Sequence, residues 1–138
     1  MNKYEQLKSD NAKLLNDFPM TFAFSNKQFE EAKIKLGVID NKDLLIIPSG
    51  GIIRKSDSKA YGDLVNHFMQ STEEAEKDDE YLYQGFLYEL GNHEYCITYD
   101  PTDTLDCFGL TIEEAQKDER LLGIFIKARK KYLEFYNF

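Results

Sequence analysis

The residues best suited to chemistry are concentrated in one stretch, residues 92–109, which reads NHEYCITYDPTDTLDCFG. It holds one of the two histidines, both cysteines, four acidic residues and two tyrosines. Carboxylate oxygens are the ligands that Mg²⁺, Ca²⁺ and Mn²⁺ prefer, and an added imidazole suits Zn²⁺ or iron. The candidate metal ligands are His93, Glu94, Asp100, Asp103 and Asp106. With His93 as base or ligand, this set would serve a metal-dependent hydrolase.

The same residues have structural roles to fill, and their spacing favours those roles. The stretch lacks the ligand spacing of an EF-hand and has no H-E-x-x-H motif. Residues alternate from His93 to Asp100, which predicts a strand with His93 and Glu94 on opposite faces. Asp100 precedes a proline and predicts a turn, after which Asp103 caps a short helix that ends before Gly109. On this interpretation the stretch holds its own backbone in shape, and no cofactor is expected.

Negative charge is concentrated in residues 73–106. This region has eleven acidic residues and one base, a balance of −10, whereas the whole chain has a net charge of −8. Direct contact with nucleic acid is disfavoured here, because phosphate needs Lys and Arg. The negative charge of this region fits a protein partner with a basic surface, and tyrosines beside acids suit such an interface. The alternative is a solvated surface that keeps the chain soluble. The candidate binding residues are Glu73, Glu74, Glu76, Asp78, Asp79, Glu80, Tyr81, Tyr83 and Tyr88.

Length and composition predict a single globular domain over residues 1–138. The chain has no apolar run long enough to span a membrane and no signal-peptide pattern at its start, which predicts a cytoplasmic protein without membrane contact. Cys96 and Cys107 lack a C-x-x-C spacing, so free, buried thiols are expected.

Hydrophobic spacing predicts about six helices. The first covers Lys3–Asp17 and ends before Pro19. The second begins at Ser25, which forms a capping box with Gln28, and ends at Gly37. Four further helices are expected over residues 57–70, 81–91, 111–118 and 118–135. The apolar face of the helix over 81–91 is expected to consist of Tyr81, Leu82, Phe86, Leu87 and Leu90, and a second capping-box pattern from Ser71 predicts a break or bend after the helix over 57–70.

Strands are expected over residues 20–24, 44–47 and 52–54, with a further one within 95–99, and the strand over 44–47 is expected to be buried. In the first of them, Met20, Phe22 and Phe24 are expected to point inward. The turn at 48–51 joins the second and third strands into a hairpin. The fold class is therefore α+β, with helices packed on a small antiparallel sheet.

The last helix has a basic side that contrasts with the acidic middle of the chain. Lys127, Arg129, Lys130 and Lys131 lie opposite its apolar stripe. This side fits the protein's own acidic region, within one chain or across a homodimer, and it is small for a nucleic-acid patch.

Three strings in the chain are distinctive, namely FPMTFAFSNKQFEEAKIKLG, GGIIRKSDSKAY and FLYELGNHEYCITYDPTDTLDCFGLT. Together they resemble a family of small, functionally uncharacterised proteins from low-GC Gram-positive bacteria and their phages and mobile elements. The last is the most specific, in ELGNHEY and YDPTDTLDCFGLT. The resemblance implies a bacterial or mobile-element context and transfers no catalytic residue.

Two functions follow as hypotheses. The first is a non-enzymatic binding protein, whose acidic region docks on the basic groove of a host nucleic-acid-targeting defence enzyme. The mobile-element context implied by the resemblance includes such inhibitors, anti-CRISPR proteins among them. The second is the metal-dependent hydrolase. The charge distribution favours the first.

Overall fold

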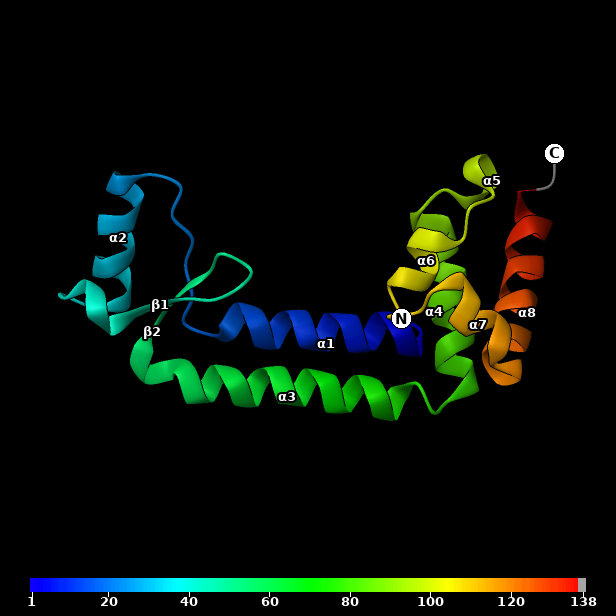
Figure 1. The fold of residues 1–138 in the computed structure, drawn as a ribbon, viewed down its shortest axis with the longest axis horizontal. Helices are drawn as coiled ribbons and strands as arrows, with labels where there is room; N and C mark the ends of the chain where they lie inside the picture. The colour runs from blue at the N-terminus through cyan, green and yellow to red at the C-terminus, as the bar shows by residue number, and fades with distance from the viewer. Residues whose placement is uncertain (137–138) are drawn as a thin grey trace. The chain divides into compact units, whose positions relative to one another are not determined.

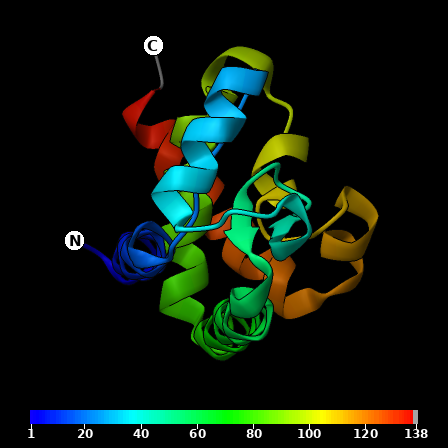
Figure 2. The same ribbon diagram turned by 90° about the vertical axis from the view of Figure 1, so that its left-hand side faces the viewer.

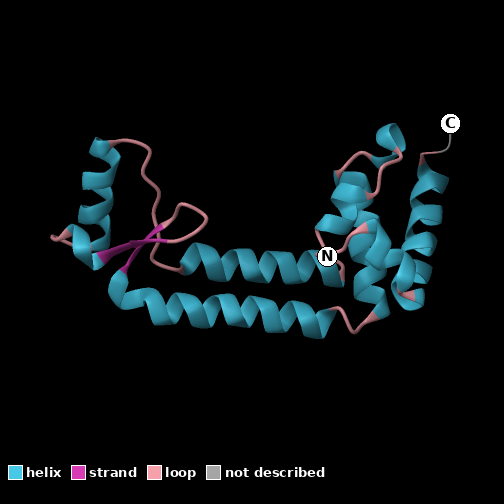
Figure 3. Cartoon of the chain, viewed as in Figure 1, coloured by secondary structure: helices cyan, strands magenta, loops and turns pink. Residues whose placement is uncertain are grey.

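The computed structural model describes residues 1–136 and consists mainly of helices (Figures 1 and 3). The α-helices are α1 (Lys3–Asp17), α2 (Asn26–Leu36), α3 (Ser58–Ala75), α4 (Asp79–Asn92), α5 (Tyr95–Thr98), α6 (Thr102–Asp106), α7 (Ile112–Lys117) and α8 (Glu119–Phe135). The strands β1 (Leu44–Ile46) and β2 (Ile52–Arg54) form an antiparallel hairpin. Helices with a small antiparallel sheet are thus confirmed, although the described chain has eight α-helices and two strands. None of these helices combines the length and the apolar character needed to cross a bilayer.

Contacts divide the chain into two compact units. The first unit comprises Met1–Lys8 and Thr72–Phe138, and the second comprises Ser9–Ser71. Helices α1 and α3 each contribute residues to both units. The expectation of a single domain stays a prediction, and each unit is described by itself.

The first unit is built on α4 packed against α8, which lie side by side (Figure 1). The predicted apolar stripe of α4 faces inward, since Leu82, Phe86 and Leu90 are all fully buried. The ring of Phe86 lies edge-on to that of Phe125 in α8, with 5.5 Å between their centroids. The periodicity of these helices therefore predicted their buried faces correctly.

A close approach of two rings to α4 explains a glycine inside that helix. A Cβ atom at Gly85 would lie 2.7 Å from Cζ of Phe108 and 2.8 Å from Cδ1 of Tyr4. Both rings pack in the core and cannot retreat without opening it. We expect Gly85→Ala to lower the free energy of unfolding by about 1–3 kcal/mol, although alanine favours helix more than glycine does.

Gly123 in α8 is the matched control for this prediction. A Cβ atom at Gly123 meets nothing within 4 Å. We expect Gly123→Ala to raise the free energy of unfolding by up to about 1 kcal/mol through helix propensity alone. Urea unfolding of both variants measures the contrast, and the same sign of change at both positions would contradict it.

The predicted capping signals in the first unit are present. Thr111 and Glu114 form a reciprocal capping box at the start of α7. The side chain of Asp118 accepts a hydrogen bond from the backbone N–H of Leu121 and caps α8. Gly109 follows α6 with a φ of 67°, the left-handed conformation expected past a helix end.

In the second unit, α2 packs on the hairpin (Figure 2). Ser25 caps α2 by accepting from the N–H of Gln28, and Gly37 ends it in the left-handed conformation, as predicted. The other half of the predicted capping box differs, because Oε1 of Gln28 accepts from the N–H of Phe24 and not from that of Ser25. The hairpin is also confirmed. The expected burial of β1 is wrong, because α2 covers β2 instead and leaves Leu45 and Ile46 exposed.

Residues 20–24 do not form the predicted strand. Thr21 makes an isolated bridge with Ile52, exchanging backbone hydrogen bonds of 2.7 and 3.1 Å. The predicted inward face is wrong as well, since Phe22 and Phe24 are exposed. Alternation of large and small residues defines the two faces of a segment but does not show which face is buried. Here the bridge at Thr21 sets which side chains point to solvent.

The strand predicted from His93 is also wrong. Residues Tyr95–Thr98 form the short helix α5, and Glu94 and Tyr99 flank it with a φ of 52° each. A strand needs a neighbouring strand for its backbone hydrogen bonds, and the described part of the first unit contains none. The N–H of Cys96 instead donates to the hydroxyl of Tyr132, at 3.0 Å.

Candidate functional site

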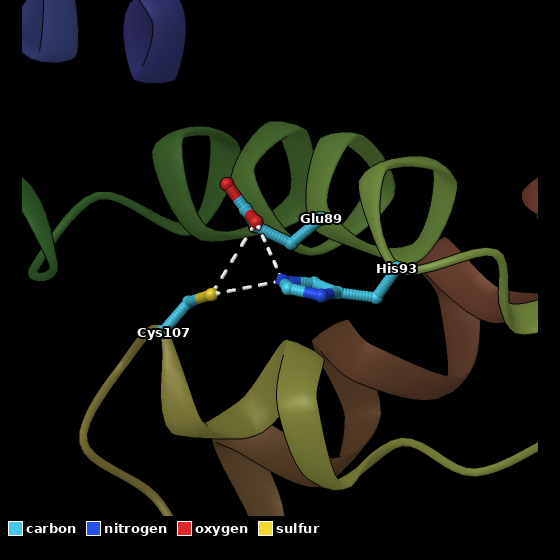
Figure 4. Close-up of side chains that lie close together, drawn as sticks. All are labelled: Glu89, His93 and Cys107. Carbon is cyan, nitrogen blue, oxygen red and sulfur yellow. Dashed lines mark hydrogen bonds and ion pairs between the residues drawn. The ribbon is translucent and has the colours of Figure 1, made fainter.

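The centre of the candidate site is Glu89, a charged residue buried on the inner side of α4 (Figure 4). Its side chain is 1% exposed. One carboxylate oxygen, Oε1, accepts hydrogen bonds from the Tyr4 hydroxyl at 2.8 Å and from the Lys8 ammonium at 3.1 Å. Both donors come from α1, so the first residues of the chain satisfy a carboxylate more than eighty residues away.

The other oxygen of Glu89, Oε2, faces a histidine and a cysteine. It lies 3.2 Å from Nε2 of His93 and 3.3 Å from Sγ of Cys107. Nε2 of His93 and Sγ of Cys107 are themselves 3.3 Å apart. Asn92 also donates to Oε2, at 3.3 Å. Three different heteroatoms therefore surround one point (Figure 4).

Two local features position these side chains. Glu89 and His93 are four residues apart at the end of α4, which places them on the same face of the helix. Cys107 follows α6 directly, and its thiol also donates to the backbone carbonyl of Asp103 at 3.3 Å. The turn at Gly109 ends this segment. Helix α6 therefore places the thiol of Cys107 beside the carboxylate of Glu89.

The network sets the protonation of the carboxylate and of the thiol. Burial alone would raise the pKa of Glu89, but hydrogen bonds from Tyr4, Lys8, Cys107 and Asn92 outweigh burial and hold it below its usual value. Burial and the hydrogen bond to Glu89 raise the pKa of Cys107 to about 11. At neutral pH the carboxylate is therefore charged and the thiol is protonated.

This arrangement differs from a nucleophilic triad. In a triad the histidine uses one ring nitrogen for the nucleophile and the other for the carboxylate. Here the single atom Nε2 of His93 faces both Cys107 and Glu89. The raised pKa of Cys107 also keeps its thiol in the weakly nucleophilic form. The side chains of Glu89, His93 and Cys107 therefore converge on one point, and they are not arranged to pass a proton from one to the next.

Only His93, of the metal ligands predicted from the sequence, belongs to this cluster. Among residues 1–136, Glu94, Asp100, Asp103 and Asp106 join no group of converging ligand atoms. Asp100 instead accepts from the N–H and the hydroxyl of Thr102, the first residue of α6, so Asp100 and not Asp103 engages the start of that helix, whose N-cap residue is Pro101. The hydrolase hypothesis therefore gains no site from these residues.

The predicted acidic residues at 73–80 lie at the surface, but several are paired within the chain. Lys3 bonds Asp78 at 2.6 Å, and Arg120 bonds Asp79 at 2.7 Å. Lys77 bonds Glu74 at 2.9 Å. Glu76 and Asp78 are half-buried, whereas Glu73, Glu74, Asp79 and Glu80 are exposed. The charge that this stretch offers to a partner is smaller than its sequence suggests.

The three tyrosines predicted to bind a partner serve mainly the first unit itself. Tyr81 is 6% exposed and belongs to the core, so it offers no surface. Tyr83 is half-buried beneath the ammonium of Lys127, which lies 5.1 Å from the ring centroid. Tyr88 is partly exposed and packs on Tyr4, with ring centroids 5.7 Å apart.

A different surface emerges at residues 94–106, here called the 94–106 segment. Ile97 is 72% exposed and Tyr99 is 64% exposed. The segment's four carboxylates are also exposed, namely Glu94, Asp100, Asp103 and Asp106. Tyr99 lines a groove of about 530 Å³ against α8, whose other walls are Ile126, Arg129, Lys130, Leu133, Glu134 and Tyr136. Large apolar side chains and acids are thus exposed on one short segment, and the groove beside Tyr99 also carries the bases Arg129 and Lys130.

Sequence reasoning missed Glu89, Lys8 and Tyr4 as site residues. The spacing of Glu89 and His93 was a usable signal, because an acid four residues before a histidine shares its helix face. The acid also lies among the apolar residues of α4, where an unpaired charge is costly. Cys107 was expected to be buried and is exposed, whereas both cysteines are free as predicted.

Comparison with known proteins identifies one family. The model of the "Family of unknown function (DUF7659)" matches residues 3–131. No curated protein and no solved structure matches the chain.

Proposed function

This chain belongs to the family of unknown function DUF7659, and we propose that it is a non-enzymatic protein-binding module. The proposed contact surface is the 94–106 segment with the groove beside it. One observation carries the proposal: Ile97 and Tyr99 stand exposed among four exposed carboxylates. An apolar centre with a charged rim is the usual anatomy of a protein interface.

The apolar part of this surface combines residues of the 94–106 segment with residues of the groove beside it. Tyr99 lines the groove together with partly exposed Ile126 and Tyr136, and exposed Ile97 lies two residues before Tyr99 in the chain. Exposed apolar patches rimmed by polar residues mark interaction sites. Tyrosine gives a large contact area at a low cost in conformational entropy, which suits Tyr99 as the anchor.

Backbone strain supports the same segment. Glu94 and Tyr99 both have a φ of 52°, the left-handed conformation that costs a residue with a Cβ atom about 1–2 kcal/mol. Strain of this kind is concentrated at functional sites. Here the two residues flank α5 and present Ile97 and Tyr99 to solvent.

The charge of the segment indicates the class of partner. Its carboxylates attract a basic surface, which speeds association and makes it weaken with salt. One such surface is the nucleic-acid groove of a host defence enzyme, where carboxylates would replace phosphates, and the proposal extends to an inhibitor of this anti-CRISPR-like kind. The exposed acids at 73–80 are a second, weaker contact, because the chain's own cations engage several of them.

Recovery of partners from the native host lysate tests the proposal with two charge-reversed forms of the full chain. The first form changes Glu94, Asp103 and Asp106 to Lys, and the second changes Glu73, Glu74 and Glu80 to Lys. Asp100 is left intact because it accepts hydrogen bonds from Thr102 at the start of α6. We expect the wild-type chain to retain a partner at low salt and to release it at high salt. The first form should lose this partner, and the second form should retain part of it. A partner indifferent to both forms, or no partner at all, would contradict the proposal.

A further inference from the structure

We propose that Glu89, His93 and Cys107 bind one divalent transition-metal ion, with Zn²⁺ as the best match. The candidate ligand atoms are Oε2 of Glu89, Nε2 of His93 and Sγ of Cys107, and they lie 3.2–3.3 Å from one another (Figure 4). They come from the end of α4 and from the residue after α6. These are the three ligand types, carboxylate, imidazole and thiolate, that Zn²⁺ accepts together.

The separations fit a tetrahedral ion. Zn²⁺ bonds of about 2.0–2.3 Å at tetrahedral angles place neighbouring ligand atoms about 3.3–3.6 Å apart. The observed distances of 3.2, 3.3 and 3.3 Å fall short of this by a few tenths of an ångström at most. Small side-chain rotations therefore admit the ion without moving the backbone. Mg²⁺ and Ca²⁺ are disfavoured, because they require mainly oxygen ligands.

The surroundings of Glu89 prepare its carboxylate for this role. Tyr4 and Lys8 bind Oε1, and burial fixes the side chain, so that Oε2 is presented to His93 and Cys107. Outer hydrogen bonds that orient a ligand are a regular part of metal sites. The amide of Asn92 also reaches Oε2, at 3.3 Å, and remains beside the ion.

The site is open to solvent on one side. Cys107 is exposed and the His93 side chain is 30% exposed, so an ion reaches the three atoms without an opening of the core. As the metal–sulfur bond forms, the thiol proton of Cys107 leaves to solvent. Three protein ligands leave a fourth position for water or for a donor from another molecule.

The ion would also close a loop of the chain. His93 and Cys107 bracket the 94–106 segment, so one ion joins both of its ends. An ion bound in this way restrains α5 and α6 and holds the exposed face around Tyr99 ready for docking. This consequence for docking rests on the proposed function, whereas the metal site itself stands without it.

Titration of the full, reduced chain with Co²⁺ tests the site directly. We expect one Co²⁺ per chain, with the visible bands of tetrahedral cobalt and a thiolate-to-cobalt charge-transfer band, both removed by an equivalent of Zn²⁺. Millimolar Mg²⁺ is expected not to compete. Absence of the bands in wild type would overturn the inference.

The chain offers matched controls, because it has one further cysteine and one further histidine. We expect Cys107→Ser and His93→Gln to weaken Co²⁺ binding by more than about 100-fold, since even outer-shell partners are worth about 10- to 100-fold. Cys96→Ser and His67→Gln should bind as wild type does. Equal effects of Cys107→Ser and Cys96→Ser, or of His93→Gln and His67→Gln, would overturn the assignment. Circular dichroism checks that each variant is folded. Metal binding without partner recovery would count against the proposed function alone, and partner recovery without metal binding against this inference alone.

Discussion

Replacing Glu89 with alanine is expected to lower the free energy of unfolding by about 2–4 kcal/mol. The carboxylate is buried and accepts hydrogen bonds from Tyr4 and Lys8. Its removal leaves the buried Tyr4 hydroxyl without that acceptor, and the shorter side chain leaves a cavity at a fully buried position.

Urea unfolding in the presence of a chelator measures this effect without a contribution from bound metal. Glu80→Ala is the matched control, because Glu80 is an exposed acid on the same helix, and its loss is expected to cost less than about 0.5 kcal/mol. Glu89→Gln keeps the size and an acceptor, and should fall between the two. Similar losses for Glu89→Ala and Glu80→Ala would contradict the role of Glu89.

The same network predicts a pH dependence. Hydrogen bonds lower the pKa of Glu89 in the folded chain, so its ionised form favours folding above the ordinary value of 4.5. This contribution is lost as the pH falls below 4.5 and through the folded-state pKa. Wild type should therefore lose stability more steeply than Glu89→Gln in this acidic range, in chelator-containing buffer. Parallel pH profiles for the two proteins would contradict it.

Tyr99→Ala is expected to weaken partner binding by about 30-fold, or about 2 kcal/mol. Tyr99 is the exposed aromatic ring at the centre of the proposed surface, where truncation removes the anchor of an interface. The change should leave folding nearly unaltered, because most of the ring is in solvent. Equilibrium binding to the recovered partner measures the loss.

Ile39→Ala provides the control for that experiment. Ile39 is an exposed apolar residue of the second unit and lies outside the proposed surface. We expect its removal to change affinity by less than about threefold. Equal losses for Tyr99→Ala and Ile39→Ala would show that the 94–106 segment is not the contact.

Local signals in the sequence predicted much of the fold. Helix α1 has the predicted bounds, and the caps at Ser25, Thr111 and Asp118 start α2, α7 and α8 as expected. The hairpin at residues 44–54 is also present. These features depend on residues within a few positions of one another, which is why a single sequence reveals them.

The failures arose where distant contacts decide the structure. Residues 93–100 alternate as a strand would, but α5 forms because the first unit offers no strand to pair with. The expected helix break at Ser71 is absent, since its hydroxyl donates back to the carbonyl of Phe68 and α3 continues to Ala75. Glu89 is satisfied from α1, a pairing that no local pattern indicates.

Photo-crosslinking from position 99 shows whether the 94–106 segment docks on a partner protein. A benzophenone amino acid replaces Tyr99 in the full chain, and the same group replaces Ile39 in a control chain. After irradiation in native host lysate at low salt, we expect one discrete protein adduct from position 99, lost at high salt and absent from position 39. No adduct from position 99, or the same adduct from both positions, would contradict it.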